Sequence, residues 1–118
     1  MSNNIIFNLT IKIEKQVELQ WLQDVKQEYL PLLVDGETII SAQINKLVLD
    51  QPEEENTFAI QFIYPSESIF DSKKLKSMEK FLNAVDKKYA GKYVYFATKM
   101  ELIHFFNKMP QSPEISLN

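Results

Sequence analysis

The feature that most constrains the fold is the stretch IIFNLTIKI, in which every odd-numbered residue from Ile5 to Ile13 is apolar. Successive side chains of a β-strand point to opposite faces, so this period of two predicts a strand with one buried face. The other side of the strand carries Asn8, Thr10 and Lys12. The pattern therefore raises the question of what this wetter side meets: water, a ligand or another copy of the chain.

The rest of the chain predicts two helices and three further strands. One helix follows the first strand, because apolar residues recur every four positions from Val17 to Tyr29. Pro31 is expected to close or kink it, since proline disfavours helical geometry in the preceding residue. The second helix lies within SESIFDSKKLKSMEKFLNAVDKKYAG, with Gly91 as its C-terminal stop. Its apolar stripe is Leu75, Met78, Leu82, Val85 and Tyr89. The other strands are expected in ETIISAQINKLVL, TFAIQFIYP and KYVYFATKMELI.

This order of elements, strand, helix, strand, strand, helix, strand, is the split βαβ pattern of the ferredoxin-like fold. The chain is therefore predicted to be an α+β protein with a four-stranded antiparallel sheet. Two right-handed crossovers would place both helices on the same face of that sheet. A length of 118 residues suits one core. We expect a single ferredoxin-like domain over residues 1–104 and a loosely ordered C-terminal tail over 105–118.

The two faces of the predicted sheet differ in polarity. The helix-covered face is expected to take the richer apolar set: Ile5, Phe7, Leu9, Ile11, Ile40, Ile44, Phe58, Ile60, Phe62, Phe96 and Met100. The opposite face would then take a mixed set: Ile6, Asn8, Thr10, Ile39, Ser41, Gln43, Ala59, Gln61, Ile63, Tyr93, Tyr95 and Ala97. An antiparallel sheet can keep one face wet. However, apolar patches on a surface mark interfaces, so this face predicts a homodimer, paired as a dimeric α/β barrel. The candidate dimer face is Ile6, Asn8, Thr10, Gln43, Gln61, Tyr93 and Tyr95.

Composition narrows the classes of function. The net charge of −3 argues against nucleic acid as a partner, because phosphate binding needs a concentrated positive surface. The chain has no cysteine, which excludes disulfides and thiolate chemistry and is compatible with a cytoplasmic location. With only two glycines, a phosphate-cradling glycine loop is excluded. No segment approaches the roughly 20 apolar residues of a membrane helix, so no membrane partner is expected.

The segments IIFNLTIKIE, WLQDVKQEYLPLLV, FAIQFIY and GKYVYFATKMEL resemble, in order and spacing, an uncharacterised bacterial family, domain of unknown function DUF4286. The resemblance spans residues 5 to 102, and its motifs are short and made of common residue types. The positions that match the motifs of the family are Asn8, Thr10, Trp21, Pro31, Phe96 and Thr98. The resemblance implies an architecture similar to dimeric α/β-barrel proteins, and it implies no established function.

Two positions depart from the pattern of that family. Tyr29 stands where the family has a histidine, and Ala97 stands where it has an arginine. These are the most chemically capable positions of the motifs, so an activity that depended on them is in doubt for this chain.

Few residues are candidates for a chemical site. His104 is the only histidine, so a histidine pair for a metal is excluded. A serine nucleophile would have only His104 as its base, and nothing in the sequence places a serine beside it. The run EEE at 53–55 predicts a solvated acidic turn rather than a cation site, because its ligands would come from one loop. We therefore expect no metal, no cofactor and no catalytic residue. Lysines on the second helix could bind an anionic surface, although a solvated helix face explains them more simply. If a pocket lies between helices and sheet, Trp21, Tyr29 and Tyr64 are the candidates to line it, because each has a polar atom that needs a partner when buried.

Two functions follow from this inventory. The favoured hypothesis is a non-enzymatic homodimeric module for binding or interaction, which uses the mixed sheet face for pairing. The alternative is a cofactor-independent oxygenase or isomerase of the dimeric α/β-barrel type, acting on a small-molecule ligand, which rests on analogy of fold. The alternative requires a preformed cavity that holds a polar group with a shifted pKa. Lys99 is the charged residue expected to mark such a cavity.

Overall fold

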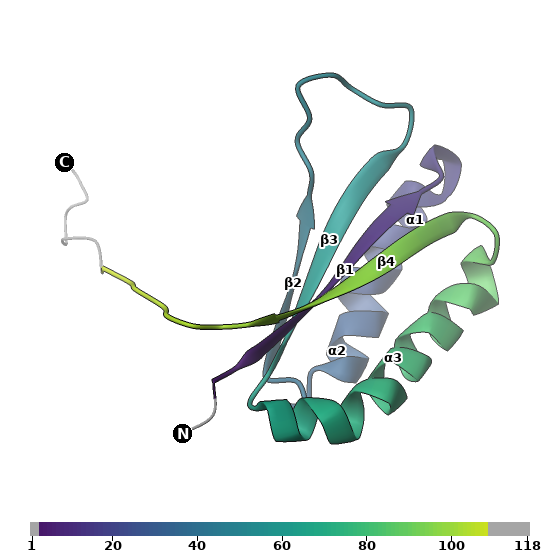
Figure 1. Cartoon of the computed structure of the whole chain (residues 1–118). Helices are drawn as coiled ribbons and strands as arrows, with labels where there is room; N and C mark the ends of the chain where they lie inside the picture. The colour runs from purple at the N-terminus through teal and green to yellow at the C-terminus, as the bar shows by residue number, and fades with distance from the viewer. Residues whose placement is uncertain (1–2, 109–118) are drawn as a thin grey trace, which may run out of the picture.

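The structure is a computed structural model, and it describes residues 3–108. It contains one antiparallel sheet of four strands, with all of the helices on one of its faces (Figure 1). The strand order is β2-β3-β1-β4, which is the ferredoxin-like arrangement that the order of elements predicts. Of the predicted tail, residues 109–118 lie outside the described part. The elements are β1 (Ile5–Ile13), α1 (Lys15–Asp24), η1 (Val25–Tyr29), α2 (Leu30–Leu33), β2 (Ser41–Lys46), β3 (Asn56–Tyr64), α3 (Glu67–Tyr89) and β4 (Tyr93–Glu101).

The central strands β1 and β3 build the core. The odd-numbered residues of β1 are buried and the even-numbered ones are half-buried, so the alternation in the sequence is the alternation of the two faces. In β3 the buried positions are the even-numbered ones from Phe58 to Tyr64, and the antiparallel register places them opposite the buried residues of β1. Burial of each large apolar side chain contributes about 1.5–3 kcal/mol, which explains why these two strands are central.

The first helical segment is α1, η1 and α2 in one continuous run. It turns Trp21, Val25 and Tyr29 onto the sheet, as the four-residue spacing predicts. The helix does not end at Pro31. A π-helical turn, η1, widens the backbone just before it, and the N–H of Leu30 donates to the carbonyl of Val25. Proline lacks an N–H and its ring crowds the carbonyl four residues earlier, so a wider turn lets the helix continue past it.

The second helical segment is α3, which lies on the same face of the sheet as the first. Its first turn is capped by Ser66, whose hydroxyl accepts a hydrogen bond from the N–H of Ile69 at 3.2 Å. Its buried stripe begins at Phe70 and continues through Phe81 and Val85. Leu75, expected in this stripe, is 75% exposed, so that expectation is wrong. Phe70 and Phe81 stand on the sheet side instead, and Leu75 lies on the opposite face of the helix.

The register of β4 overturns part of the predicted allocation of faces. The N–H of Glu14 donates to the carbonyl of Lys92 at 2.9 Å and so sets the first rung between β1 and β4. Tyr93 then lies opposite Ile13, and Tyr95 opposite Ile11, so both tyrosines face the helices rather than the uncovered side. Ala97 faces the helices as well, opposite Leu9. Phe96 and Met100, expected under the helices, share the uncovered face with Thr10 and Ile6. The prediction was wrong because it gave the more apolar set to the core.

The start of β2 also differs from the prediction. Ile39, expected on the uncovered face, is fully buried in the core, whereas Ile40 is exposed. The carboxylate of Asp35 accepts hydrogen bonds from the N–H groups of residues 37 to 39. This turn folds Ile39 inward before the strand begins at Ser41, so the strand alternation does not extend to it.

Candidate functional site

The face of the sheet that no helix covers is the strongest candidate for a site, and we call it the open face. Register fixes its members, because residues paired across antiparallel strands point to the same side. The open face consists of Ile6, Asn8, Thr10, Lys12, Ser41, Gln43, Asn45, Thr57, Ala59, Gln61, Ile63, Val94, Phe96, Thr98 and Met100. Five of the seven residues predicted for the dimer face belong to it, and Tyr93 and Tyr95 do not.

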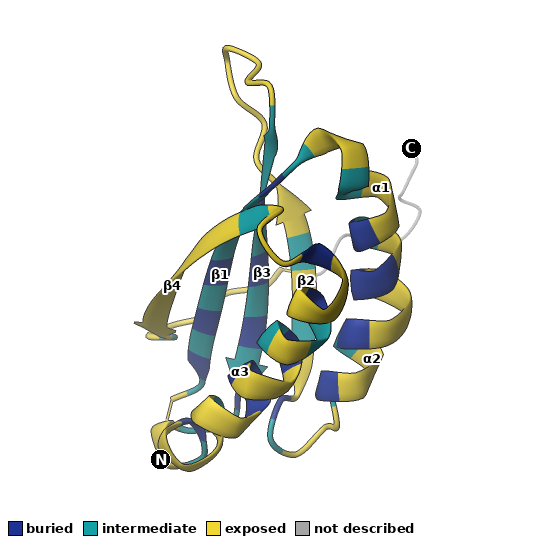
Figure 2. Cartoon of the chain, turned by 90° about the vertical axis from the view of Figure 1, so that its right-hand side faces the viewer, coloured by how far each residue is buried: buried dark blue, intermediate teal, exposed yellow. Residues whose placement is uncertain are grey.

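The apolar part of the open face is concentrated on β4. Val94 is 67% exposed and Phe96 is 63% exposed, and Met100 is exposed as well. Ile6 is paired with Met100 on one side and with Ile63 on the other, which extends the apolar surface across three strands. Figure 2 shows β4 as an almost entirely exposed strand beside the buried bands of β1 and β3. The apolar residues of the open face thus form a contiguous patch, whereas exposed apolar residues on a monomer are normally scattered singly.

A row of polar side chains crosses the middle of the open face. The row runs over all four strands: Gln43, Gln61, Asn8 and Thr98. Gln43 donates to Gln61 at 3.5 Å, and the amide nitrogen of Asn8 donates to Thr10 at 3.0 Å. The side-chain oxygen of Asn8 is buried and has no hydrogen-bond partner among the described residues. An unsatisfied buried acceptor is costly, so Asn8 is the least well satisfied polar side chain among the described residues of the open face.

The three residues predicted to line a pocket are all buried, but the structure does not gather them around one cavity. Trp21 packs on Phe58, with ring centroids 5.3 Å apart, and Tyr64 packs on Phe70 at 5.0 Å. These contacts lie towards opposite ends of β3. Tyr29 packs against α3 and borders an open groove of about 490 Å³ between the helices. The indole N–H of Trp21 has no hydrogen-bond partner among the described residues.

A buried carboxylate at the end of α1 links this helix to α3. Asp24 is only 5% exposed. Its oxygens accept hydrogen bonds from Gln20 at 3.0 Å, from Lys88 at 2.8 Å and from the hydroxyl of Tyr89 at 2.5 Å. We call Asp24, Gln20, Lys88 and Tyr89 the Asp24 clasp. No signal near Asp24 in the sequence indicates it, because Lys88 and Tyr89 are 64 and 65 residues away.

The pKa values of the clasp follow from its geometry. Burial favours the neutral form of Asp24, but the hydrogen bonds from Lys88, Tyr89 and Gln20 outweigh it and hold the pKa of Asp24 below its usual range. Burial raises the pKa of Tyr89, and the adjacent Asp24 raises it further. The hydrogen bond to Asp24 raises the pKa of Lys88. All three groups are thus held in their ordinary neutral-pH forms, which suits a structural tie between helices.

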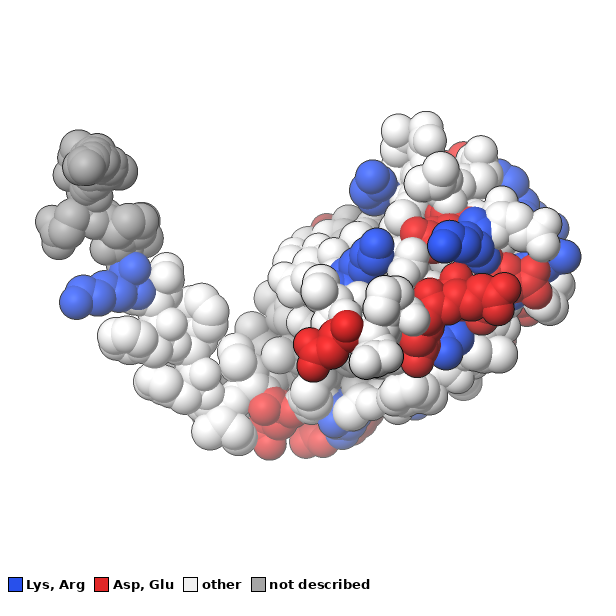
Figure 3. Space-filling model, turned by 90° about the horizontal axis from the view of Figure 1, so that it is seen from above, with Lys and Arg blue, Asp and Glu red and all other residues white. Residues whose placement is uncertain are grey.

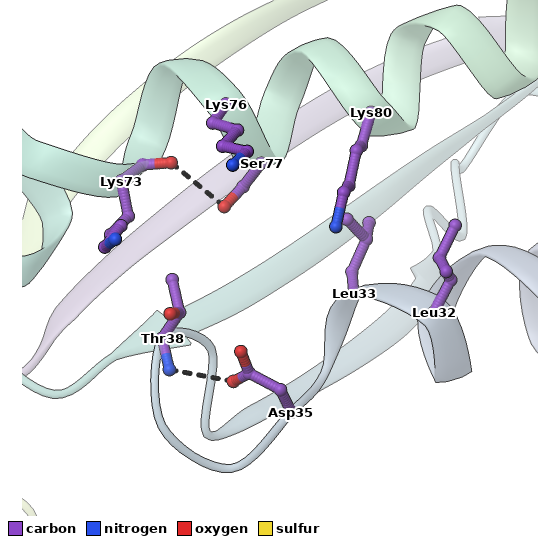
Figure 4. Close-up of a pocket in the computed structure, with 8 residues that line it drawn as sticks. All are labelled: Leu32, Leu33, Asp35, Thr38, Lys73, Lys76, Ser77 and Lys80. Atoms are coloured by element: carbon purple, nitrogen blue, oxygen red, sulfur yellow. Dashed lines mark hydrogen bonds between the residues drawn. The ribbon is translucent and has the colours of Figure 1, made fainter.

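A small groove lies between α3 and the turn that follows α2, with a volume of about 170 Å³ (Figure 4). Three lysines of α3 and one carboxylate, Asp35, line it, so the groove is basic. The backbone N–H groups of Glu37 and Thr38 lower the pKa of Asp35 and keep it ionised. The lysines are exposed and hydrated, which limits how strongly they could hold an anion. The lining is Leu32, Leu33, Asp35, Thr38, Lys73, Lys76, Ser77 and Lys80.

The other residues singled out for chemistry lie on the surface. Lys99 faces the helices at the edge of the sheet, where it pairs with Glu67 at 2.6 Å and with Asp71 at 4.0 Å. His104 is exposed beyond the end of β4. Within residues 3–108, no group of three or more histidine, aspartate or glutamate side chains is placed to hold a metal ion. In the same part of the chain, no helix combines the length and the apolar character needed to cross a bilayer.

Solved structures similar to this one identify the class of fold. A dimeric ferredoxin-like protein from an uncultured marine organism has a TM-score of 0.65 and 7% identity, over 88% of this chain and 99% of that one. A second such protein, also from an uncultured marine organism, has a TM-score of 0.63 and 13% identity, over 91% and 94%. SnoaB, a cofactor-independent oxygenase from Streptomyces nogalater, has a TM-score of 0.62 and 6% identity, over 91% and 100%. At these identities the similarity shows a ferredoxin-like fold.

The family follows from the sequence. The model of Domain of unknown function (DUF4286) matches residues 4–103, and the chain belongs to this family. No curated protein matches the chain. The resemblance seen in the short motifs of β1, α1 and β4 is thereby confirmed.

Proposed function

We propose that the protein is a non-enzymatic homodimeric module, in which two copies pair through the open face of the sheet. One observation carries the proposal: β4 turns its apolar side chains, Val94, Phe96 and Met100, away from the helices and onto the uncovered side. In a lone copy this arrangement exposes apolar surface. Against a second copy the same side chains would be buried and would contribute to association.

The polar row supports the same mode of pairing. In a twofold pair each surface meets itself, so a row that crosses the centre of the face would meet its own copy. The amides of Gln43 and Gln61 each carry N–H donors and an oxygen acceptor, so the row offers both kinds of hydrogen-bonding group to a second copy. Two of the similar structures are described as dimeric ferredoxin-like proteins, which is consistent with this use of the fold.

The enzymatic alternative lacks support from a specific residue. It requires a cavity with a charged or titrating group inside it, and Lys99, the residue expected to mark one, is exposed and ion-paired. The buried carboxylate Asp24 has its oxygens occupied by the clasp. SnoaB is similar in fold alone, so its activity does not transfer to this chain.

Sedimentation velocity over a concentration series from nanomolar to high micromolar tests the proposal. We expect the wild-type chain to form dimers within this range and Phe96→Asp to weaken pairing by about 100-fold, because a carboxylate would be buried between the sheets. Leu75→Asp is the matched control, since Leu75 is similarly exposed but lies on the far side of α3. A wild-type protein that remains monomeric throughout the range would contradict the proposal.

A further inference from the structure

The chain leaves the fold after β4 as an extended, apolar arm, which we define as residues 102–108. Figure 1 shows this segment running away from the sheet rather than folding back onto it. The N–H of Leu102 donates to the carbonyl of Asn4 at 2.9 Å, which continues the pairing with the chain ahead of β1. Beyond that bond, the backbone of residues 103–106 makes no hydrogen bond to any other described residue.

The side chains of the arm have the character of an interface. Ile103 is 76% exposed, Phe105 72% and Phe106 78%. In Figure 3 the arm is a mostly uncharged segment with a positive charge near its outer end, where the sequence has Lys108. Two adjacent exposed phenylalanines favour apolar cover, and the unpaired backbone groups of residues 103–106 favour pairing with the edge of a strand.

The free edge of β2 offers both. β2 is hydrogen-bonded to β3 alone, so the N–H and C=O groups on its outer side are unpaired within the sheet. The chain just beyond β2 exposes three consecutive apolar residues, Leu47, Val48 and Leu49, and Val48 is 93% exposed. The six residues of β2 match the length of the arm beyond Leu102, and each spans roughly 20 Å when extended.

The strand order decides which copy contributes the edge. β4 and β2 lie at opposite edges of the same sheet, so the arm does not run along the β2 of its own chain. Turning a sheet over exchanges its edges. In a face-to-face pair whose twofold axis runs obliquely to the strands, the end of β4 of one copy therefore crosses over β2 of the other. The arm then leaves β4 beside the free edge of the partner.

The area of the open face also calls for an additional contact. Four strands about 4.8 Å apart and about seven residues long give a flat footprint of roughly 450 Å². A standard stable interface buries about 800 Å² on each partner. Side chains that project from the sheet increase the area above this flat value, but the open face alone remains small for a stable interface. Contact with the arm would increase the buried area.

We propose that the arm is exchanged between two copies: residues 103–108 of each chain add a strand to the free edge of β2 in the other and pack on Leu47, Val48 and Leu49. This inference rests on the proposed function, because it requires a pair to form. It extends that function by naming a second contact surface and by making each copy incomplete without the other.

Photocrosslinking in the full-length protein tests the exchange. Phe105→p-benzoylphenylalanine is prepared in ¹⁵N-labelled and unlabelled forms, which are mixed and irradiated, and the crosslinked peptides are identified by mass spectrometry. We expect adducts of mixed isotopic composition that join the arm to residues 41–49. Leu75→p-benzoylphenylalanine is the control and should give no such adduct, because it is equally exposed but lies on α3.

Sedimentation of the same preparations separates the two proposals. Phe105→Asp combined with Phe106→Asp should weaken pairing by at least about 10-fold, whereas Leu75→Asp should leave it unchanged. If the dimer forms with undiminished affinity and the adducts stay within one chain or fall outside residues 41–49, the arm exchange is overturned and pairing through the open face stands. If the wild-type chain is monomeric throughout, both are overturned.

Discussion

β1 and β4 are neighbouring strands of nine residues each, yet they distribute their apolar residues in opposite ways. β1 points its apolar side chains, except that of Ile6, at the helices. β4 points Tyr95 and Lys99 there, both exposed, and turns Val94 and Phe96 to the open face. This difference shows the extent of the helical layer: the helices cover the central strands but leave the β4 edge exposed (Figure 2). A strand beyond that layer gains little from an apolar residue on the helix side.

The largest effect should come from the covered side of β1. Leu9 is 1% exposed, and Leu9→Ala removes its buried surface and leaves a cavity, so we expect a loss of about 3–5 kcal/mol in the free energy of unfolding. Urea denaturation at fixed protein concentration, followed by the fluorescence of Trp21, measures it. Thr10→Ala, one position along on the open face, is the control and should cost less than about 1 kcal/mol. Equal losses at the two positions would remove the distinction between the faces.

The helical layer that makes β1 an interior strand is tied together by the Asp24 clasp, which predicts the next effect. Asp24→Asn keeps the shape but removes the charge that strengthens three hydrogen bonds, so we expect a loss of about 1.5 kcal/mol at neutral pH. Its folded pKa is lowered, so the stabilisation is complete above the unfolded pKa of about 3.9 and is lost as pH falls through the folded value.

Denaturation of the wild type and of Asp24→Asn between pH 7 and pH 2 therefore gives a difference that shrinks below about pH 4. Gln23→Ala is a suitable control, since Gln23 lies next to Asp24 in the sequence but is exposed. A difference that stays constant down to pH 2 would show that the charge of Asp24 does not stabilise the helical layer.

A smaller effect is expected on the open side of β4. Val94→Ser removes an apolar side chain that is exposed in one copy and buried in the proposed pair. We expect the dissociation constant of the dimer to rise about 10-fold, or about 1.4 kcal/mol, with little change in monomer stability. Sedimentation equilibrium measures the constant. Leu19→Ser on α1, also a strongly exposed residue, should leave it unchanged, and an equal effect of both substitutions would contradict the role given to β4.

The smallest effect is expected on the helix side of the same strand. Lys99 forms an ion pair with Glu67 at 2.6 Å, but both side chains are largely exposed. Lys99→Met should change the free energy of unfolding by less than about 0.5 kcal/mol, because water and salt screen such pairs. A double-mutant cycle with Glu67→Gln at low and high salt measures the coupling. A coupling above about 1 kcal/mol would mean that the helical layer reaches over β4 after all.

Much of the fold was predictable because it follows from the local spacing of apolar residues. The alternation from Ile5 to Ile13 indicates a strand with one buried face, and the four-residue spacing from Val17 to Tyr29 indicates the helix that covers it. The order of the six main elements then leaves few topologies, because crossovers are right-handed. Asn8 and Gln61 were assigned to the uncovered face for the same reason: each lies between apolar residues in a strongly alternating strand.

The residues that could not be predicted are those whose surroundings come from distant parts of the chain. Both sides of β4 are partly apolar, so its pattern is ambiguous, and the bond between Glu14 and Lys92 decides which side meets the helices. The sequence around Asp24 is that of an ordinary solvated residue, and its burial depends on contacts with Lys88 and Tyr89 of α3. The sequence by itself determined which segments become strands and helices, since backbone geometry ties the spacing of apolar residues to each element. Only the tertiary structure decided which side of β4 is covered and which carboxylate is buried, because register and long-range packing depend on hydrogen bonds between segments far apart in the chain.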